Sequence, residues 1–395
     1  MSDHVLTLNA GSSSVKFALF AVEPDGPLLV AGGQAEGLGA EPLFHARVVG
    51  GPACDSALAS NDHQGAINAI VDWVDETLPR AVIAAVGHRV VHGGVCYAAP
   101  IIVDDAALAA LETLAPLAPL HQRHNLSGIR AARRAFPGEP QIACFDTAFH
   151  RGHDFLNEVY ALPRAFYERG LRRFGFHGLS YEFISLRLRD VDPVVAGGRV
   201  IVAHLGNGAS ICAMKDGRSV ASTMGFSALE GLPMGTRCGR IDPGLLLYLL
   251  EHDKMSVDGL SQLLYRESGL LGLSGLSQDM RTLEASDSAQ AREAIDYFVH
   301  HICMEIAALA AVLKGLDALV FTGGIGEHSP HVRAAVIESL KWLGFALDAP
   351  ANAGNAPLIS SSASRAPVYV IATDEESMIA RHAIDAAGLA RAVAA

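Results

Sequence analysis

Two short segments have the composition of phosphate-binding loops. They are residues 9–16 (NAGSSSVK) and 204–210 (HLGNGAS). Small residues let backbone N–H groups approach an oxyanion, serine hydroxyls add donors, and Lys16 adds a positive charge. No GxxxxGK[ST] pattern follows the first segment, which excludes a Walker-type P-loop. An ordinary glycine hairpin has the same composition, so the segments alone leave both interpretations open.

A third glycine cluster, residues 321–329 (FTGGIGEHS), ends a β-prone run and opens a helical pattern. A glycine-rich turn of this kind permits close approach of a nucleotide to a helix N-terminus. The cluster is equally typical of a tight strand-to-helix turn. The amide of Asn207 in the second segment can also donate to a phosphoryl oxygen, so the three segments together favour phosphate chemistry.

Two arginines lie beside glycines, Arg89 in residues 87–94 (GHRVVHGG) and Arg237 in residues 234–239 (MGTRCG). The planar guanidinium group matches the oxygens of carboxylate and phosphoryl groups. Two of them at a cleft would hold both an acid substrate and a migrating phosphoryl group. The alternative is that each arginine pairs with a structural carboxylate.

Two of the 17 histidines are candidates for binding an anion. His177 lies between apolar and glycine residues, and His121 follows a proline-leucine pair. An imidazole beside apolar residues can hydrogen-bond an anion while lining a small pocket, although a satisfied structural histidine has the same surroundings. His88 and His92 have i,i+4 spacing without an HExxH pattern, which argues against zinc.

Two carboxylates follow predicted strands, where ligands bind in open α/β sheets. Asp146 comes after residues 141–145, and Glu375 comes after residues 368–371. Mg²⁺ keeps most of its waters and needs only one or two protein carboxylates beside phosphates, so these two would suffice. For Glu375 the alternative is an acidic residue at a helix start, favoured by the helix dipole.

These segments require strands and helices to position them. Residues 5–8 and 15–20 indicate a hairpin around the first loop, and residues 200–203 and 211–214 repeat the design around the second. The repetition predicts two related α/β domains, with chance as the alternative. Residues 37–60 read as an irregular edge or loop. Further strands are predicted at 82–86, 141–145 and 318–321, and helices at 64–78, 106–114, 288–314 and 330–343.

The composition limits the class of protein. A chain of 395 residues is long for one core, which favours two domains. The net charge of -12 argues against nucleic acid or an anionic membrane as partner. Six scattered cysteines without a metal pattern, and no signal-like or membrane-spanning apolar run, predict a cytoplasmic protein.

Taken together, these segments resemble the acetate kinase family, in order and at similar spacing from Val5 to Ala380. The resemblance implies two duplicated ribonuclease H-like (actin-like ATPase) domains with an interdomain active-site cleft. The first would span residues 1–147, completed by a helix at about 377–395. The second would span residues 148–376 and carry the nucleotide pocket and a homodimer interface.

The resemblance also assigns roles to residues of this chain. The catalytic residues would be Arg89, Asp146, His177, Arg237, Asn207 and His121. ATP or ADP would contact Ser12, Ser14, Lys16, His204, Leu205, Gly206, Asn207, Gly208, Asp279, Met280, Arg281, Gly324, Ile325, Gly326, Glu327 and His328. Asn9 and Glu375 would organise Mg²⁺ or Mn²⁺. The acid would contact Arg89 and an apolar pocket of Val91, Leu120, Phe176 and Ala228.

The implied reaction is reversible, direct in-line transfer of the ATP γ-phosphoryl group to acetate, giving acetyl phosphate and ADP, a step toward acetyl-CoA. The family usually has proline where this chain has Ala228, and the smaller side chain would enlarge the acid pocket. A propionate kinase of the same fold is therefore an alternative. A non-catalytic actin-like nucleotide-binding protein is another, although it leaves the two arginines unexplained.

Overall fold

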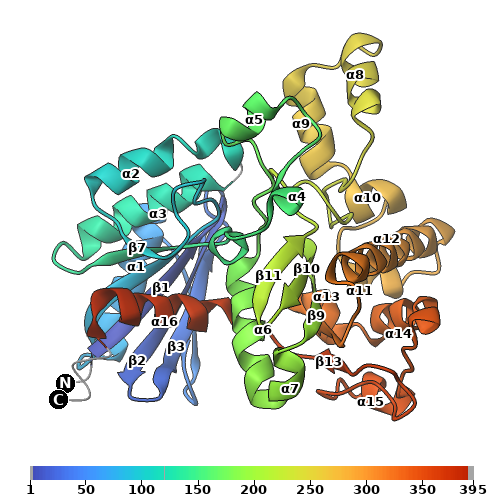
Figure 1. The fold of residues 1–395 in the computed structure, drawn as a ribbon. Helices are drawn as coiled ribbons and strands as arrows, with labels where there is room; N and C mark the ends of the chain where they lie inside the picture. Colours follow the sequence, from blue (N-terminus) through green and yellow to red (C-terminus); the bar gives the residue numbers. More distant parts are fainter. Residues whose placement is uncertain (1–2, 120, 390–395) are drawn as a thin grey trace. The chain divides into compact units, whose positions relative to one another are not determined.

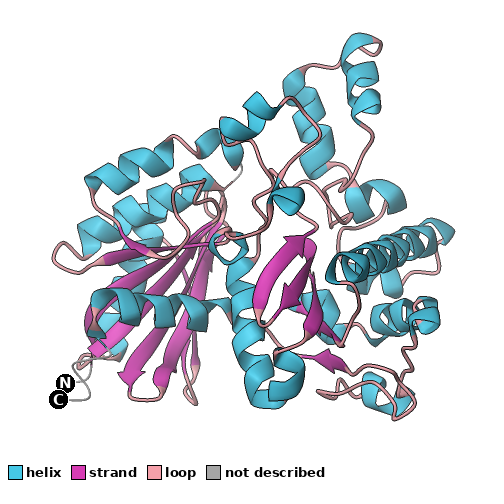
Figure 2. Cartoon of the chain, viewed as in Figure 1, coloured by secondary structure: helices cyan, strands magenta, loops and turns pink. Residues whose placement is uncertain are grey.

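The computed structural model describes residues 3–119 and 121–389, which form two compact units (Figure 1). The first unit is Met1–Phe149 with Asp374–Ala395, and the second is His150–Thr373. Each contains one β-sheet with helices packed against it (Figure 2). The division lies close to the boundaries expected from the sequence, but Ala148, Phe149 and residues 374–376 fall in the first unit.

The first unit has an eight-stranded sheet in the order β5-β4-β3-β2-β1-β6-β8-β7. β1 and β2 form the predicted hairpin, and β6 and β8 continue the sheet in parallel to β1. β1 is buried along nearly its whole length, which is why it reads as a continuous apolar run. The strands are β1 (Asp3–Ala10), β2 (Ser14–Glu23), β3 (Gly26–Glu36), β4 (Leu43–Val48), β5 (Ala53–Ala57), β6 (Val82–Val90), β7 (Ile101–Ile102) and β8 (Gln141–Phe145).

Helices cover both faces of this sheet (Figure 1). α1 (His63–Thr77) and α3 (Gln122–Ala135) share one apolar core with side chains of β1, β2 and β6. Gly87 of β6 points to the other face, where a Cβ atom would lie 2.6 Å from Ile379 of α16 (Glu375–Ala387). α2 (Asp105–Glu112) packs beside α3.

The second unit has a five-stranded sheet in the order β11-β10-β9-β12-β13. β9 and β10 form the second predicted hairpin, while β12 and β13 run parallel to β9. Figure 1 shows α6 (Gly178–Val191) and α12 (Ala289–Leu313) on opposite sides of this sheet. The strands are β9 (Arg199–Leu205), β10 (Ala209–Lys215), β11 (Arg218–Ser222), β12 (Ala318–Thr322) and β13 (Val368–Val370).

Shorter helices surround the second sheet. Those that precede β9 in the chain are α4 (Phe155–Glu158), α5 (Arg164–Glu168) and α7 (Pro193–Ala196). Those between β11 and β12 are α8 (Pro243–Glu251), α9 (Val257–Arg266), α10 (Gly269–Ser274) and α11 (Met280–Glu284). Those after β12 are α13 (Gly323–His328), α14 (Pro330–Ser339) and α15 (Ala349–Ala353). The helix predicted at 330–343 ends earlier, because the chain turns into a 3₁₀ segment at Lys341–Leu343.

The two sheets repeat one topology. The order β3-β2-β1-β6-β8 in the first unit corresponds to β11-β10-β9-β12-β13 in the second, with an antiparallel meander followed by two parallel strands. The predicted duplication and α/β fold class are therefore confirmed. Residues 37–60, which have no clear pattern, contain the mostly exposed edge strand β5 and its neighbour β4.

α12 has the length and apolar composition to cross a membrane, and it is the one helix of this kind in residues 3–119 and 121–389. Its buried side chains, among them Ile302 and Ile306, are typical of a core helix. It packs against β9 and β10 and against α10, α11 and α14. This packing explains the apolar composition without a membrane.

Candidate active site

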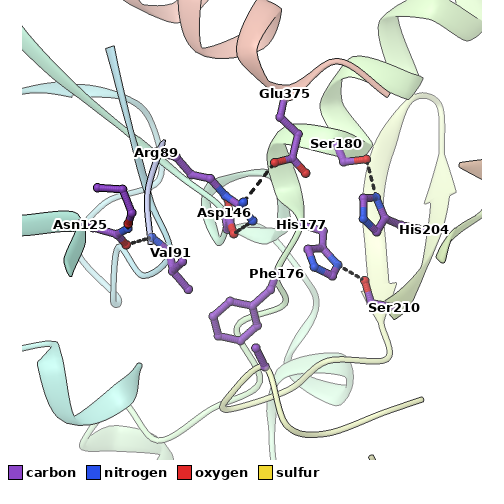
Figure 3. A network of polar contacts seen from close by, with 12 residues as sticks. Arg89, Val91, Asn125, Asp146, Phe176, His177, Ser180, His204, Ser210 and Glu375 are labelled. Atoms are coloured by element: carbon purple, nitrogen blue, oxygen red, sulfur yellow. Dashed lines mark hydrogen bonds and ion pairs between the residues drawn. The ribbon is translucent and has the colours of Figure 1, made fainter. Parts of the chain in front are cut away.

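Arg89 is held in a fixed orientation by carboxylates of the first unit. It lies near the end of β6, and its Nε and Nη2 atoms donate to both oxygens of Asp146, at 3.0 and 2.8 Å (Figure 3). Its Nη1 atom lies 3.4 Å from Oε2 of Glu375, the first residue of α16. The three side chains that the sequence suggested for one site are therefore brought together.

The geometry keeps Arg89 charged. Burial alone lowers the pKa of Arg89, but attraction to Asp146 and Glu375 outweighs burial and raises that pKa above its usual value. The Asp146 side chain is 2 % exposed and accepts a bidentate hydrogen bond, so it fixes the plane of the guanidinium group. Arg89 therefore does pair with carboxylates, which was the alternative considered for it. The carboxylates are Asp146 and Glu375, both of which were predicted to belong to the site.

Asn125 was not among the predicted site residues, although it holds two of the predicted segments together. Its Oδ1 atom accepts from the backbone N–H of Val91 at 3.1 Å, and its Nδ2 atom donates to the carbonyl of Ala10 at 2.8 Å (Figure 3). A Cβ atom at Gly128, one turn further along α3, would lie 2.7 Å from the Ala10 side chain. α3 therefore packs closely against β1 and positions the first glycine loop.

The tip of β1–β2 exposes the predicted donors. Asn9 pairs with Lys16 across the hairpin, and the turn is closed by a hydrogen bond from Gly11 N–H to the Ser14 carbonyl at 2.8 Å. Ser12 and Lys16 are exposed. His121 lies at the N-terminal cap of α3, and Leu120 lies outside the described residues. The loop therefore presents hydroxyl, amide and ammonium groups on one tip.

In the second unit, His177 occupies a left-handed backbone conformation. Its φ is 58°, just before the first residue of α6. Such a conformation is uncommon for a residue with a side chain and is concentrated at functional sites. Gly175 has φ of +77°, and a Cβ atom there would lie 2.5 Å from the His150 ring. This turn directs the His177 ring at Ser210, whose Oγ atom lies 2.9 Å from His177 Nδ1 (Figure 3).

Three predicted residues meet at the second glycine loop. A Cβ atom at Gly208 would lie 3.3 Å from His177 Nε2 and 3.6 Å from Arg237 Nη2. A Cβ atom at Gly235 would lie 2.1 Å from Asn207 Oδ1, so the Asn207 side chain packs against that glycine. Arg237 also donates to the carbonyl of Ala228 at 2.9 Å. The backbone of Ala228, the residue predicted to line the acid pocket, is thus bound by the second arginine.

A cavity of about 340 Å³ adjoins this loop, a volume at the lower end of the range typical for small-molecule sites. Eight of its lining residues were predicted to contact the nucleotide and three were not. The predicted ones are Gly206, Asn207, Asp279, Met280, Arg281, Gly324, Ile325 and His328, and the others are Gln278, Glu284 and Ser329. The side chains of Asp279 and Arg281 pair with each other, which lowers the pKa of Asp279 to about 2.

Other predicted nucleotide contacts do not line this cavity. Glu327 turns back into the fold, where Oε1 accepts from Gly323 N–H at 2.8 Å and from Thr373 N–H at 3.1 Å. Gly326 is buried, and its carbonyl accepts from Arg333, which is 0 % exposed. Leu205 is also fully buried. These residues brace the turn between β12 and α13, because backbone groups of a glycine-rich turn need partners inside the fold.

Comparisons with known proteins show which family this chain belongs to. The model of the acetokinase family matches residues 4–381. The chain belongs to the acetokinase family. An acetate kinase from Methylocella silvestris is 55 % identical, with 97 % of this chain and 98 % of that protein covered.

Solved structures of the same family share the fold. A propionate kinase from Francisella tularensis has a TM-score of 0.91 and 36 % identity, covering 98 % of this chain and all of that one. The acetate kinase of Porphyromonas gingivalis has a TM-score of 0.88 and 35 % identity, covering 97 % and 99 %. The resemblance inferred from the sequence is therefore confirmed, and the chain has the two-domain fold and the kinase activity of this family.

Two buried histidines predict a loss of stability in acid. Burial lowers the pKa of His88 and of His150 to about 4, against 6.5 when unfolded, and both rings are hydrogen-bonded. The unfolded chain therefore binds more protons between these values. We expect the free energy of unfolding to be highest above pH 6.5 and to fall toward pH 4, by about 1.4 kcal/mol per pH unit for each histidine. Urea titrations across this range measure the slope, and His88→Gln should make it shallower; an equal slope in the variant contradicts this assignment.

Proposed function

We propose that this protein transfers the γ-phosphoryl group of ATP to acetate. A carboxylate oxygen of the acid attacks the γ-phosphorus, a new O–P bond forms, and the bond to the β,γ-bridging oxygen breaks, leaving ADP. A carboxylate is already ionised at neutral pH, so no general base is required. The observation that carries the proposal is the meeting of Arg237, His177 and Asn207 at the second glycine loop, beside a cavity of about 340 Å³.

The second unit would bind the nucleotide and stabilise the transferred group. The cavity lined by Met280 and Ile325 suits an adenosine moiety, and the loop with His204, Gly206 and Gly208 suits its phosphates. Charge in this transfer spreads over the equatorial phosphoryl oxygens. Donors fixed before the reaction stabilise that charge without reorganisation.

The first unit would bind the acid and the polyphosphate tail. Arg89, oriented by Asp146, has the fork geometry that a carboxylate or phosphoryl oxygen accepts. Ser12, Ser14 and Lys16 supply further donors from the hairpin tip. By likeness to the family, His121 and the apolar side chain of Val91 would complete the binding site for the acid.

The residues present fit a divalent cation of the Mg²⁺ or Mn²⁺ type that is bound mainly by water and phosphate. No group of three His, Cys, Asp or Glu side chains suited to a metal occurs in residues 3–119 and 121–389. Both oxygens of Asp146 are engaged by Arg89, so Glu375 and the amide of Asn9 would hold the ion. When bound, such an ion would neutralise phosphate charge. Arg89 and Arg237 would orient the reactants.

Assembly and location are inferred from the surface. α8 has no buried residue although its sequence is PGLLLYLLE, and Leu245, Leu247 and Tyr248 are 46, 57 and 50 % exposed. An exposed apolar surface of this kind favours a partner, and we propose a homodimer. Light scattering should give twice the mass of one chain, and Leu247→Glu should lower the measured mass.

The cysteines and the charge bear on location and other partners. Cys96 is an exposed thiol, as expected in a reducing cytoplasm, and the acidic net charge disfavours nucleic acid and membranes as partners.

The two arginines provide the direct test of the reaction. The wild-type protein should form acyl phosphate, measured as hydroxamate, from acetate, ATP and Mg²⁺. We expect Arg89→Ala and Arg237→Ala to lower kcat/KM by more than about a hundredfold in protein that remains folded at the assay temperature, because each removes charge stabilisation at the transferred group. Arg187→Ala, which breaks an exposed pair with Asp190, is the matched control and should change kcat/KM by less than about twofold. Near-normal turnover in both site variants would contradict the mechanism, and a wild type that forms no acyl phosphate would favour a non-catalytic nucleotide-binding protein.

The small side chain of Ala228 predicts weak discrimination among short acids. Phosphorylation of propionate is the second candidate activity, because the chain is similar to a solved propionate kinase. One methylene changes discrimination by about 1–3 kcal/mol, or roughly 10–200-fold. Because the smaller Ala228 side chain enlarges the pocket, we expect the low end of this range, with kcat/KM values for acetate and propionate within roughly tenfold of each other. Ala228→Pro keeps the carbonyl that accepts from Arg237 and should shift the ratio toward acetate. Steady-state kinetics with acetate, propionate and butyrate measures this. A clear wild-type preference for propionate would instead assign propionate as the substrate.

A further inference from the structure

The imidazole rings of His177 and His204 are stacked in the second unit. Their centroids lie 4.4 Å apart with an interplanar angle of 26° (Figure 3). Both Nε2 atoms face the glycine loop, since a Cβ atom would lie 3.3 Å from His177 Nε2 at Gly208 and 4.0 Å from His204 Nε2 at Gly206. The Nδ1 atoms point the other way, into the fold. The protonation state of Nδ1 therefore decides what each ring presents to the loop.

A chain of two hydroxyl groups ends at Nδ1 of His177. The Ser210 Oγ atom lies 2.9 Å from Nδ1 and 2.5 Å from the hydroxyl oxygen of Tyr181. Tyr181 is 0 % exposed, and burial together with the thiol of Cys212 raises its pKa well above the usual value, so the phenol keeps its proton. A buried hydroxyl donates its hydrogen where an acceptor is present, and Ser210 Oγ is that acceptor. The Ser210 hydrogen is then directed at Nδ1, which makes Nδ1 an acceptor.

The second ring is held in the same way by different residues. Thr373 Oγ1 donates to Ser180 Oγ at 2.8 Å, and Ser180 Oγ lies 2.8 Å from Nδ1 of His204. Because Ser180 accepts from Thr373, its own hydrogen is available for Nδ1. Both rings consequently have an acceptor nitrogen toward the fold and carry their proton on Nε2.

The charged and titratable groups around the pair also favour neutral rings. Arg237 Nη2 approaches the same face of Gly208 as His177, and a cation there disfavours an imidazolium. His150, which contacts Tyr181 edge to face, and the Cys212 thiol are neutral because burial moves their pKa values to about 4 and about 12. The carboxylate of Glu327, which contacts Thr373, accepts a hydrogen bond from the backbone N–H of that residue. Two stacked imidazolium rings would in addition repel each other.

We propose that Tyr181 and Thr373 are positioning residues that keep His177 and His204 as neutral Nε2–H donors to the phosphoryl oxygens. The assignment rests on the proposed kinase function for the identity of the acceptor. A neutral donor supplies a directed hydrogen bond to the transferred group without adding positive charge that would bind ATP and ADP more tightly. The donors also stay unchanged across neutral pH.

Nitrogen chemical shifts of the labelled histidines test the protonation states directly, without turnover. In the wild type, His177 and His204 should show the neutral Nε2–H form from about pH 6 to about pH 8, the range in which an ordinary imidazole titrates. Tyr181→Phe keeps the ring that packs against His150 and removes the donor to Ser210. In this variant Ser210 can accept from Nδ1–H, so His177 should populate the other tautomer and the cation. An imidazolium or an Nδ1–H tautomer in the wild type would overturn the proposal.

Kinetics supplies the second measurement. Tyr181→Phe should lower kcat near neutral pH by about tenfold, comparable with the loss of a partner that orients a metal-bound histidine, and should leave KM for ATP nearly unchanged. The kcat profile should gain an ionisation in the imidazole range. Thr373→Val should act similarly through His204, and Thr373→Ser should restore most of the lost activity because it keeps the hydroxyl. Tyr369→Phe removes another tyrosine hydrogen bond in this unit, to Asp192, and is the matched control.

The outcomes separate the two proposals. A Tyr181→Phe profile and tautomer identical to those of the wild type and of Tyr369→Phe would overturn the role of Tyr181. If the Tyr181→Phe protein does not fold, Thr373→Val and its serine rescue apply the same test to the hydroxyl pair at His204. Neutral Nε2–H rings in a protein that forms no acyl phosphate would overturn the kinase assignment and leave the protonation states standing.

Discussion

The antiparallel pairing of β9 with β10 is the interaction on which the second unit's site depends. Its register places Ser210 directly opposite His204. Side chains of opposed residues in an antiparallel pair lie on the same face of the sheet. The ring of His177, which is bound to Ser210, is therefore stacked on His204. A slip of one residue would turn Ser210 and its partners to the other face and would dissolve the stack.

The first unit achieves orientation by charge. Arg89 comes from β6 and Asp146 follows β8, and these strands run parallel, with Arg89 opposite Cys144 and Val90 opposite Phe145. The carboxylate therefore emerges one position beyond the strand, where the arginine side chain reaches it. Burying two charges is costly unless the geometry is good and other hydrogen bonds help. The bidentate contact and the additional carboxylate of Glu375 meet that condition.

A chain with a net charge of -12 is a poor general binder of anions. The donors proposed to bind anions are concentrated at two hairpin tips and two arginines. Glycine at 208 and 235 leaves room for imidazole, guanidinium and amide groups beside the loop, because a Cβ atom there would approach His177, Arg237 or Asn207. Under the proposed function, selectivity for a phosphorylated ligand would arise from this local geometry and not from the overall charge.

The sequence by itself determined what depends on neighbouring residues. Alternating and continuous apolar runs predicted both hairpins, and glycine and serine predicted their tips, because strand and turn preferences are local. The repetition of one design predicted the duplicated fold. Residue type together with neighbouring glycines singled out Arg89 and Arg237, and a position after a predicted strand singled out Asp146. Similarly, the glycine cluster at 321–329 was found by composition, although its members divide between lining the cavity and bracing the turn.

Only the tertiary structure decided which side chains meet. Glu327 lies in a glycine-rich loop that suggested nucleotide contact, yet it turns inward because the N–H groups of Gly323 and Thr373 need an acceptor there. Asn125, Ser180 and Tyr181 carry no local signal, since serine, asparagine and tyrosine occur throughout the chain. Ser210 ends the second glycine segment, but nothing local indicated that it would bind His177. Their roles depend on strand register, on the left-handed turn at His177 and on how helices pack against the sheets. Those are long-range relations, and a local pattern of residue types does not encode them.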